Sequence, residues 1–439
     1  MKSRQAAVVF ILVTVTLDVL AMGLIIPVLP KLILDFLGGI MTNAADWNGW
    51  FALVFALMQF FCSPVLGVLS DRFGRRPIIL LSNLGLGLDY VVMALAPTIG
   101  WLFLGRIISG ITTSSIPTAM AYIADVTPKE KRAAAFGLIG VAFGVGFAFG
   151  PALGGLLSNF NPRLAFWVAA GLSLANWVWG YFFVPESLAP EKRKEFALRR
   201  ANPVGSLVLL RSHPDLWRLA TIQFLAYLAH NAFSVWALYA IYRYAWDQLT
   251  IGISLMIVGV CTAVISAGLT GRMVKRFGER RTLYTGQFFG ATGMFIAGLA
   301  RSGAVYMASV PIISLWNMSM PAAQSMMTHR VSEREQGELQ GALGSLRSIT
   351  FIIGPVLFSQ VFSWFIDPKH SFHVPGAPYY LAGALLFTAM FLSTRLEQPP
   401  TLASPPVGRT RPVARSTSIP QQPEIIPPEG IGSTVPPEL

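Results

Sequence analysis

Residues 67–77 read GVLSDRFGRRP and connect two long apolar stretches of the chain. A second copy, GRMVKRFGERR, occupies residues 271–281, 204 residues further on (67 to 271). The same offset relates four further pairs of glycines and prolines: Pro117 and Pro321, Gly137 and Gly341, Gly150 and Gly354, and Pro151 and Pro355. Glycine lets helices approach closely and proline bends them, so matched positions indicate matched helix shapes. The chain therefore contains two similar halves.

Apolar stretches in both halves are long enough to cross a membrane. The sequence is 54% apolar and 12% charged, whereas soluble domains are about 25% charged. Crossing the hydrocarbon core takes about 20 helical residues, more than the roughly 9–11 of a barrel strand. Twelve stretches reach this length: 6–30, 47–70, 77–97, 101–124, 133–158, 164–185, 219–242, 249–271, 282–300, 302–328, 339–365 and 374–394. We therefore predict an all-α polytopic membrane protein with twelve transmembrane helices in two pseudo-symmetric six-helix bundles, and exclude a water-soluble globule.

The composition between and after these stretches predicts the domain boundaries. We expect an N-terminal bundle over 1–185, a polar, basic cytoplasmic linker over 186–218 and a C-terminal bundle over 219–396. The tail, 397–439, is rich in proline and has no apolar periodicity. Such a segment cannot bury enough apolar surface to offset its ordering entropy, so we expect it to be disordered.

The basic residues indicate how the chain is oriented. The net charge is +12, and most Lys and Arg lie on the same alternate connections as the 67–77 loop. The other connections hold few: Lys31, Arg163, Arg243, Arg301 and Lys369. Basic loops stay in the cytoplasm, so both termini are predicted to be cytoplasmic, in a plasma (inner) membrane. The charge then indicates anionic lipid rather than nucleic acid as a partner.

The 67–77 loop has the pattern GxxxDRxGRR, which resembles the signature of the major facilitator superfamily. The resemblance implies a cytoplasmic latch made by Gly67, Asp71, Arg72, Gly74, Arg75 and Arg76. The second copy departs from the signature, with Lys275 and Glu279 in place of Asp71 and Arg75. Asp125 matches a cytoplasmic gate acid of the family's tetracycline-efflux branch. A solvated helix-end residue near Lys129 is the alternative interpretation of Asp125.

A second motif lies in the predicted fifth span, where the pattern GxxxGPxxGG resembles the superfamily's antiporter motif. Its residues are Gly146, Gly150, Pro151, Gly154 and Gly155. Small residues four apart also favour close helix packing by themselves, which is the alternative interpretation. As an antiporter motif, the pattern implies an exporter.

Further segments resemble the tetracycline-efflux branch of the superfamily, among them Leu17–Asp18, Leu88–Tyr90 and Gly105–Thr112. The resemblance implies that Asp18, Asp89 and Arg106 serve proton coupling and substrate contact. Asp18 and Asp89 lie deep in spans one and three, where an unpaired carboxylate is costly. A proton and a substrate can therefore compete for each carboxylate, as exchange requires. The alternative is a structural pairing with Arg106.

The second half departs from that branch at two positions. Gly290 stands in span nine where the branch usually carries an acid, and Arg347 adds a positive charge to span eleven. This positive charge disfavours the binding of a cationic metal–drug complex. We therefore expect a neutral, zwitterionic or anionic substrate, with tetracycline still a candidate. Residues predicted to line the cavity are Gln223, Asn231, Trp236, Asn317 and Arg347, besides His230.

These features together predict a proton-coupled secondary transporter that exports a small organic compound by alternating access, and no enzyme. The apolar spans hold no catalytic cluster, no metal site and no nucleotide-binding Walker sequence, so we expect neither cofactor nor ATP. Its partners are the substrate, protons and lipids, and we expect a functional monomer. A facilitator or symporter that imports a nutrient and a transporter-like sensor or scaffold are the alternatives.

Overall fold

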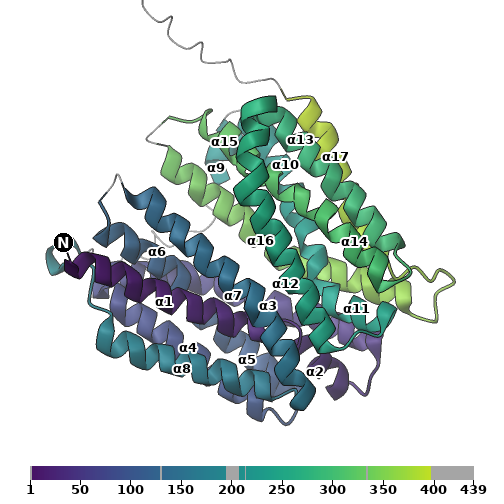
Figure 1. Cartoon of the computed structure of the whole chain (residues 1–439), viewed down its shortest axis with the longest axis horizontal. Helices are drawn as coiled ribbons and strands as arrows, with labels where there is room; N and C mark the ends of the chain where they lie inside the picture. The colour runs from purple at the N-terminus through teal and green to yellow at the C-terminus, as the bar shows by residue number, and fades with distance from the viewer. Residues whose placement is uncertain (1, 129–130, 194–206, 213, 333–334, 397–439) are drawn as a thin grey trace, which may run out of the picture. The chain divides into compact units, whose positions relative to one another are not determined.

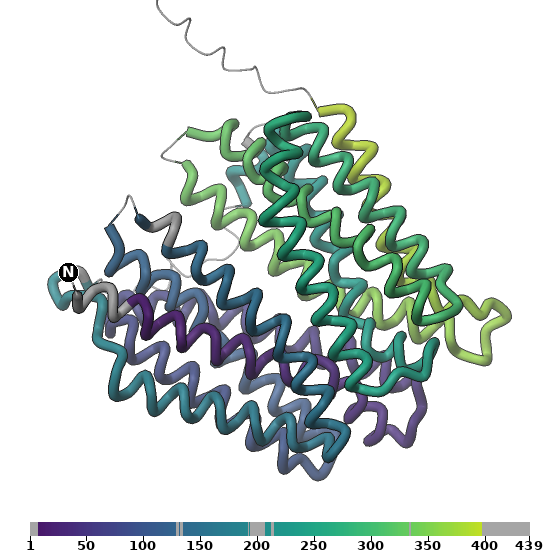
Figure 2. Tube along the Cα trace, in the orientation of Figure 1, coloured from purple at the N-terminus to yellow at the C-terminus, as the bar shows by residue number. Residues whose placement is uncertain are grey.

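The computed structural model describes residues 2–128, 131–193, 207–212, 214–332 and 335–396, and every regular element within them is helical. The predicted tail, most of the linker's centre and both chain ends lie outside these residues. Figures 1 and 2 show two groups of helices that follow the two halves of the chain. The prediction of an all-helical fold is confirmed.

The first group holds α1–α8. Its bounds are α1 (Lys2–Ile25), α2 (Leu29–Phe36), α3 (Met41–Phe73), α4 (Arg75–Leu95), α5 (Ile99–Thr112), α6 (Ser115–Val126), α7 (Arg132–Phe160) and α8 (Leu164–Phe183). One span breaks between α5 and α6, around Thr113. Pro117 has no N–H to donate to the carbonyl of residue 113, so the helix is interrupted there.

The second group repeats this layout. Its elements are α9 (Leu207–Ser212), α10 (Pro214–His230), η4 (Asn231–Val235), α11 (Trp236–Tyr244), α12 (Gln248–Val264), η5 (Ile265–Leu269), α13 (Thr270–Leu299), α14 (Gly303–Ser314), η6 (Leu315–Met318), α15 (Ser319–Thr328), α16 (Gln336–Ile366) and α17 (Ala377–Thr394). Pro321 lies 204 residues after Pro117, and the 3₁₀ turn η6 precedes it at the equivalent place. The repeated prolines thus produce repeated helix breaks.

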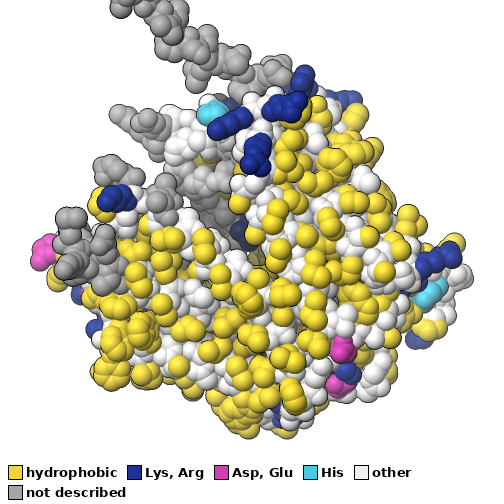
Figure 3. Space-filling model, in the orientation of Figure 1, with side chains coloured by type: hydrophobic (Ala, Val, Ile, Leu, Met, Phe, Trp, Pro, Cys, Tyr) yellow, Lys and Arg dark blue, Asp and Glu magenta, His cyan; other side chains and the backbone are white. Residues whose placement is uncertain are grey.

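The described helices can be grouped into the twelve predicted membrane spans. In the described residues, nine helical stretches are long and apolar enough to cross a membrane. The longest, Gln248–Leu299, has 52 residues and leaves helical geometry at Gly278, where φ is 79°. Counting that stretch as two and adding α8 and the α14–α15 stretch gives twelve. Apolar side chains cover most of the face seen in Figure 3, as expected of a surface that contacts lipid.

The segment predicted as a linker, 186–218, is partly helical. It holds the short turn η2 (Pro190–Lys192), α9 and the start of α10. Leu209 and Leu210 of α9 are buried in an apolar cluster with Leu216 and Leu219 of α10. This part of the linker, from Leu207 on, is therefore packed onto the second group of helices.

The two groups touch along α7 and α12 at one end and separate toward the other. A Cβ added to Gly155 would lie 2.2 Å from the Gln248 carbonyl oxygen, and one on Gly252 would lie 2.2 Å from that of Pro151. A Cβ on Gly259 would be 3.7 Å from its nearest neighbour, and one on Gly144 would have nothing within 4 Å. The gap between the groups therefore widens toward the start of α7, the end that carries the 67–77 loop.

Candidate substrate cavity and proton-coupling site

A cavity of about 520 Å³ lies between the two groups of helices, and Figure 3 shows a hollow between them. Cavities of roughly 300–1,000 Å³ suit drug-sized molecules. Helices α1, α3, α6 and α16 and the connection between α5 and α6 contribute its walls. The lining residues are Met22, Ala56, Gln59, Phe60, Ser63, Pro64, Thr113, Ile116, Pro117, Gly341, Gly344, Ser345, Arg347, Ser348 and Phe351. Among them, Arg347 alone is charged.

Arg347 is exposed on the cavity wall. Its guanidinium carbon lies 5.5 Å from the centre of the Phe351 ring, a cation–π distance. His230 lies near the same ring. Its ring centroid is 6.5 Å from that of Phe351 and 5.8 Å from that of Trp316. In the described part of the chain, no acidic side chain forms an ion pair with Arg347.

The other four residues predicted for the cavity are engaged elsewhere. Gln223 is buried, and the Asn231 amide donates to the Tyr227 carbonyl at 2.8 Å. Trp236 donates to Ser254 Oγ at 3.2 Å and stacks on Tyr306 at 4.0 Å between ring centroids. The Asn317 amide donates to Thr262 Oγ1 at 3.2 Å. These contacts lie within the second group of helices, and none of the four residues is among the lining residues.

Asp18 is buried inside the first group of helices, where α1 meets α4 and α8. Asn176 Nδ2 of α8 donates to Asp18 Oδ1 at 2.9 Å. With its amide nitrogen turned toward the carboxylate, Asn83 of α4 donates to both Asp18 oxygens at 3.2 and 3.1 Å. Asp18 itself does not line the cavity, but Met22, one turn further along α1, does. Two amides thus hold this carboxylate directly behind the cavity wall.

Asp89 is fully buried and lies just past the middle of α4, on the Leu95 side. Its nearest cation is Arg106 of α5, with 3.8 Å between Arg106 Nη2 and Asp89 Oδ2. Neither carboxylate oxygen of Asp89 has a hydrogen-bond donor in the described residues. Arg106 also lies over the Phe55 ring at 5.7 Å, and the next residue, Ala56, lines the cavity. Asp89 and Arg106 therefore form a loosely paired, buried couple one layer from the cavity.

The predicted antiporter motif lies where three helices meet. Gly146, Gly150 and Gly154 of α7 face α1: a Cβ on Gly150 would lie 2.8 Å from the Cα of Gly23. Gly155 and Pro151 face α12 of the other group. Only residues without a side chain permit this approach. The motif thus lets α7 pack closely on both its own group and the opposite one.

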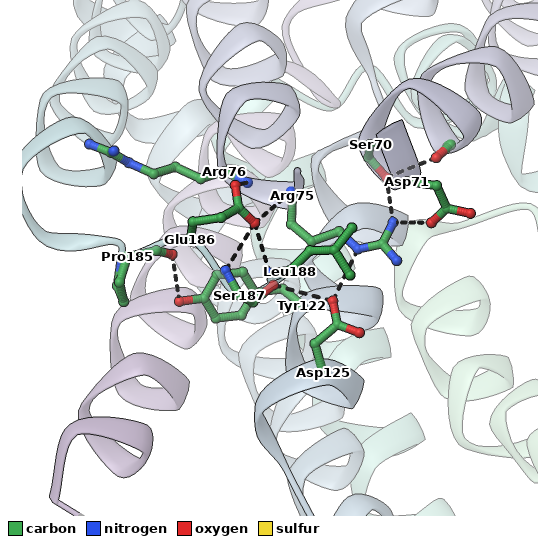
Figure 4. A network of polar contacts seen from close by, with 11 residues as sticks. Ser70, Asp71, Arg75, Arg76, Tyr122, Asp125, Pro185, Glu186, Ser187 and Leu188 are labelled. Carbon is green, nitrogen blue, oxygen red and sulfur yellow. Dashed lines mark hydrogen bonds and ion pairs between the residues drawn. The ribbon is translucent and has the colours of Figure 1, made fainter. Parts of the chain in front are cut away.

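The 67–77 loop forms a polar network at the widening end of the gap (Figure 4). The Arg75 guanidinium lies 2.5 Å from Asp71 Oδ1 and 3.1 Å from Asp125 Oδ2, and it donates to Ser70 Oγ at 2.7 Å. Arg76 donates to the Tyr181 carbonyl. Arg72 lies over the Phe73 ring, and Gly67 faces open space. Arg75 therefore connects α3, α4 and α6.

Glu186 lies at the centre of this network. The sequence did not indicate this role for Glu186. Its carboxylate accepts from the backbone N–H groups of Arg75 at 2.9 Å and Arg76 at 3.2 Å, the first residues of α4. An anion at a helix N-terminus satisfies free N–H groups. Gly74, with φ of 107°, makes room, because a Cβ there would lie 2.2 Å from Glu186 Oε2. The available sequence signal was an acidic residue directly after an apolar span. The partner of Glu186, the start of α4, lies more than a hundred residues earlier in the chain.

The second copy of the loop has a related contact of opposite sign. Glu279 stands at the position equivalent to Arg75, and its Oε2 lies 3.6 Å from His329 Nδ1. His329 stands 204 residues after Asp125. Glu279 also accepts a hydrogen bond from Ser325. Acid and base have exchanged places, so the contact between equivalent helices is kept although the sequence motif is not.

Comparison with known proteins identifies the family. The model of the Major Facilitator Superfamily matches residues 11–355 and 222–426. A class C tetracycline resistance protein of Escherichia coli is 39% identical over 83% of this chain and 91% of its own length. A class B protein of Escherichia coli is 32% identical over 80% and 87%.

Among solved structures, that of the human organic anion transporter MFSD10 (TETRAN) aligns with a TM-score of 0.66 at 24% identity. The alignment covers 89% of this chain and 99% of that one, and it shows the shared fold. The chain therefore belongs to the major facilitator superfamily of membrane transporters, in the tetracycline-efflux branch of that family's proton-coupled drug exporters.

Proposed function

We propose that this protein exports a small organic compound through the central cavity in exchange for protons, by alternating access. Membership of the tetracycline-efflux branch supports proton-coupled export, and the names of the relatives make tetracyclines candidate substrates. The cavity between two similar halves is the arrangement expected when one half rocks against the other around a fixed site. The protein acts as a carrier and not as an enzyme.

The proposal places this multi-pass protein in the plasma (inner) membrane as a functional monomer. Both termini and the linker are cytoplasmic, as the distribution of basic residues favours. The two bundles are 1–185 and 219–396, joined by 186–218 and followed by the tail 397–439. With this orientation, the gap between α7 and α12 opens toward the cytoplasm. The structure then corresponds to the inward-facing state, ready to load substrate from the cell.

Asp89 is the proposed proton carrier, and the observation that carries this proposal is its lack of hydrogen-bond donors. A buried carboxylate that accepts no hydrogen bond in the described residues can take up a proton without breaking one, and Arg106, 3.8 Å away, faces the charge that remains when the proton leaves. Asp18 differs, because two asparagine amides stabilise its charged form. We infer that Asp89 releases and takes up the proton while Asp18 transmits the change to α1 and to Met22 in the cavity wall.

The latch and the antiporter motif have mechanical roles in the proposal. Arg75, Asp71 and Asp125 tie α3, α4 and α6 together at the cytoplasmic end, so the first bundle moves as one body. The glycine face of α7 packs closely on α1 within the first bundle, and Gly155 lets α7 move against α12 of the other bundle during rocking, because only backbone atoms meet Gly155 there.

Transport into inverted membrane vesicles tests the coupling. We expect Asp89→Asn to reduce proton-driven uptake of tetracycline, the probe, at least tenfold, while exchange of labelled for unlabelled tetracycline without a gradient persists. Asp18→Asn is expected to have a smaller effect of the same kind. Asp35→Asn is the matched control, because Asp35 pairs with Lys31 on the surface, away from the cavity. Full proton-driven uptake by Asp89→Asn would contradict the proposal.

A further inference from the structure

We propose that Arg347 makes this cavity a binding site for organic anions: the preferred cargo carries a negatively charged group, such as a carboxylate or sulfonate, on an apolar or aromatic body. The inference rests on the proposed export function and names the substrate class for the same cavity. A cationic metal–drug complex is disfavoured in this cavity, because the positive charge of Arg347 would repel it.

The first step is the absence of a protein counter-ion at Arg347. A charged side chain inside a membrane span is costly and usually pairs with an acid or faces a water-filled cavity. Arg347 faces the cavity, and no carboxylate in the described residues pairs with it. The nearby polar groups, Gln59, Ser63 and Ser348, are neutral. The described lining of the cavity therefore has a net positive charge that an anionic ligand can neutralise.

The second step concerns the two buried acids, which are not available to balance this charge. Asp89 is held beside Arg106, and Asp18 is held by Asn83 and Asn176. Neither carboxylate lines the cavity. The acids thus serve the proton inside the first bundle, while the positive charge serves the cargo between the bundles. The proton site and the substrate site carry opposite charges, and Arg347 lies on α16 of the other bundle, away from Asp18 on α1 and Asp89 on α4.

The third step is that the second bundle has no room for an acid where the branch usually has one. A Cβ on Gly290 would lie 2.9 Å from Trp316 Cβ and 3.1 Å from a methyl group of Leu386. Trp316 contacts the His230 ring, His230 contacts the Phe351 ring, and Phe351 lies beside the Arg347 guanidinium. The glycine is therefore part of the packing that supports the aromatic wall behind Arg347.

The remaining lining residues define the body of the cargo. Met22, Phe60, Pro64 and Phe351 give apolar and aromatic surface, and Phe351 is held under the Arg347 guanidinium. An aromatic anion can stack on a phenyl ring while its charged oxygens meet the guanidinium fork. Sulfonates, carboxylates and phosphonates all satisfy this geometry.

The charge of the cargo changes the driving force. Export of a monoanion in exchange for one proton moves two charges in the direction that an inside-negative potential favours. For each charge moved, a potential of 100 mV increases the substrate concentration gradient that transport can reach by about fiftyfold. Exchange of a monovalent cation for one proton moves no net charge. Dependence of transport on the membrane potential is therefore a signature of the proposal.

Equilibrium binding to the purified full chain is the first test, with 1-naphthalenesulfonate and its neutral sulfonamide as paired probes. We expect the sulfonate to bind at least tenfold more tightly than the sulfonamide. Arg347→Gln should abolish this preference without weakening sulfonamide binding, and Arg347→Lys should retain part of it. Arg301→Gln, which removes an exposed arginine on an outer turn, is the matched control.

Proteoliposome transport is the second test. A lumen-positive potential, set with potassium and valinomycin, should accelerate uptake of the sulfonate by inverted carriers in the wild type but not in Arg347→Gln. Equal binding of the two probes, no sulfonate binding at millimolar concentration, or an unchanged preference in Arg347→Gln would overturn the inference. Proton-driven tetracycline uptake that persists in those cases would show that the export function stands although the anion site does not.

Discussion

At the scale of single residues, Gly105 controls the position of the proposed proton carrier. A Cβ at Gly105 would lie 2.6 Å from Asp89 Oδ1 and 2.6 Å from Met93 Cγ. Gly105→Ala must therefore displace the carboxylate from Arg106, and overpacking of this kind costs about 1–3 kcal/mol. We expect at least a tenfold loss of proton-driven uptake and a lower melting temperature. Gly100→Ala on the same helix, with its nearest neighbour at 3.8 Å, should leave both unchanged, and a normal Gly105→Ala protein would contradict the assigned geometry.

At the scale of elements, the latch is expected to be stronger in the first bundle than its counterpart in the second. Arg75 is mostly buried and contacts residues of two other helices, so a double-mutant cycle of Arg75→Ala with Asp125→Ala should give a coupling energy of about 0.5–3 kcal/mol. His329 is half exposed beside Glu279, and exposed pairs contribute about 0–1 kcal/mol. Thermal unfolding of the purified single and double variants measures both cycles, and equal couplings would argue against the difference.

The elements also show how much of the fold could be predicted from the sequence. Twelve spans and the helix breaks before Pro117 and Pro321 were predictable, because apolar length and proline act locally. The rotation of each helix was not, since depth along a span does not say which face meets which neighbour. Asp18 therefore lies against Asn83 and Asn176 instead of in the cavity wall.

Long-range partners were equally hidden from the sequence. The contact of Glu186 with the start of α4 joins residues 110 and 111 apart, which no local pattern reports. The charge exchange between the Arg75–Asp125 and Glu279–His329 contacts became visible only when the two halves were compared in space. Arg347 was found from the sequence because a charge in an apolar span is conspicuous whichever way the helix faces.

At the scale of the whole molecule, we expect the close contact between α7 and α12 to exist only while the gap at their other end is open, as it is in this structure. Gly252 is the tighter of the two α12 glycines, since a Cβ there would lie 2.2 Å from the Pro151 carbonyl oxygen. Gly252→Leu should therefore destabilise the observed state by about 1–3 kcal/mol and shift the population toward the opposite-facing state by about 5- to 150-fold. Gly259→Ala, where the nearest atom is at 3.7 Å, is the matched control.

The shift can be measured by labelling a cysteine in the cavity wall. Ser348→Cys lines the cavity, and Cys62 and Cys261 are first replaced by serine in a background that still transports. Labelling by a membrane-impermeant maleimide added to inverted vesicles should be fast in this background and in Gly259→Ala. In Gly252→Leu it should fall at least fivefold, because the cytoplasmic opening is closed more of the time. Unchanged labelling together with normal expression would mean that the α7–α12 contact does not control which side of the membrane the cavity faces.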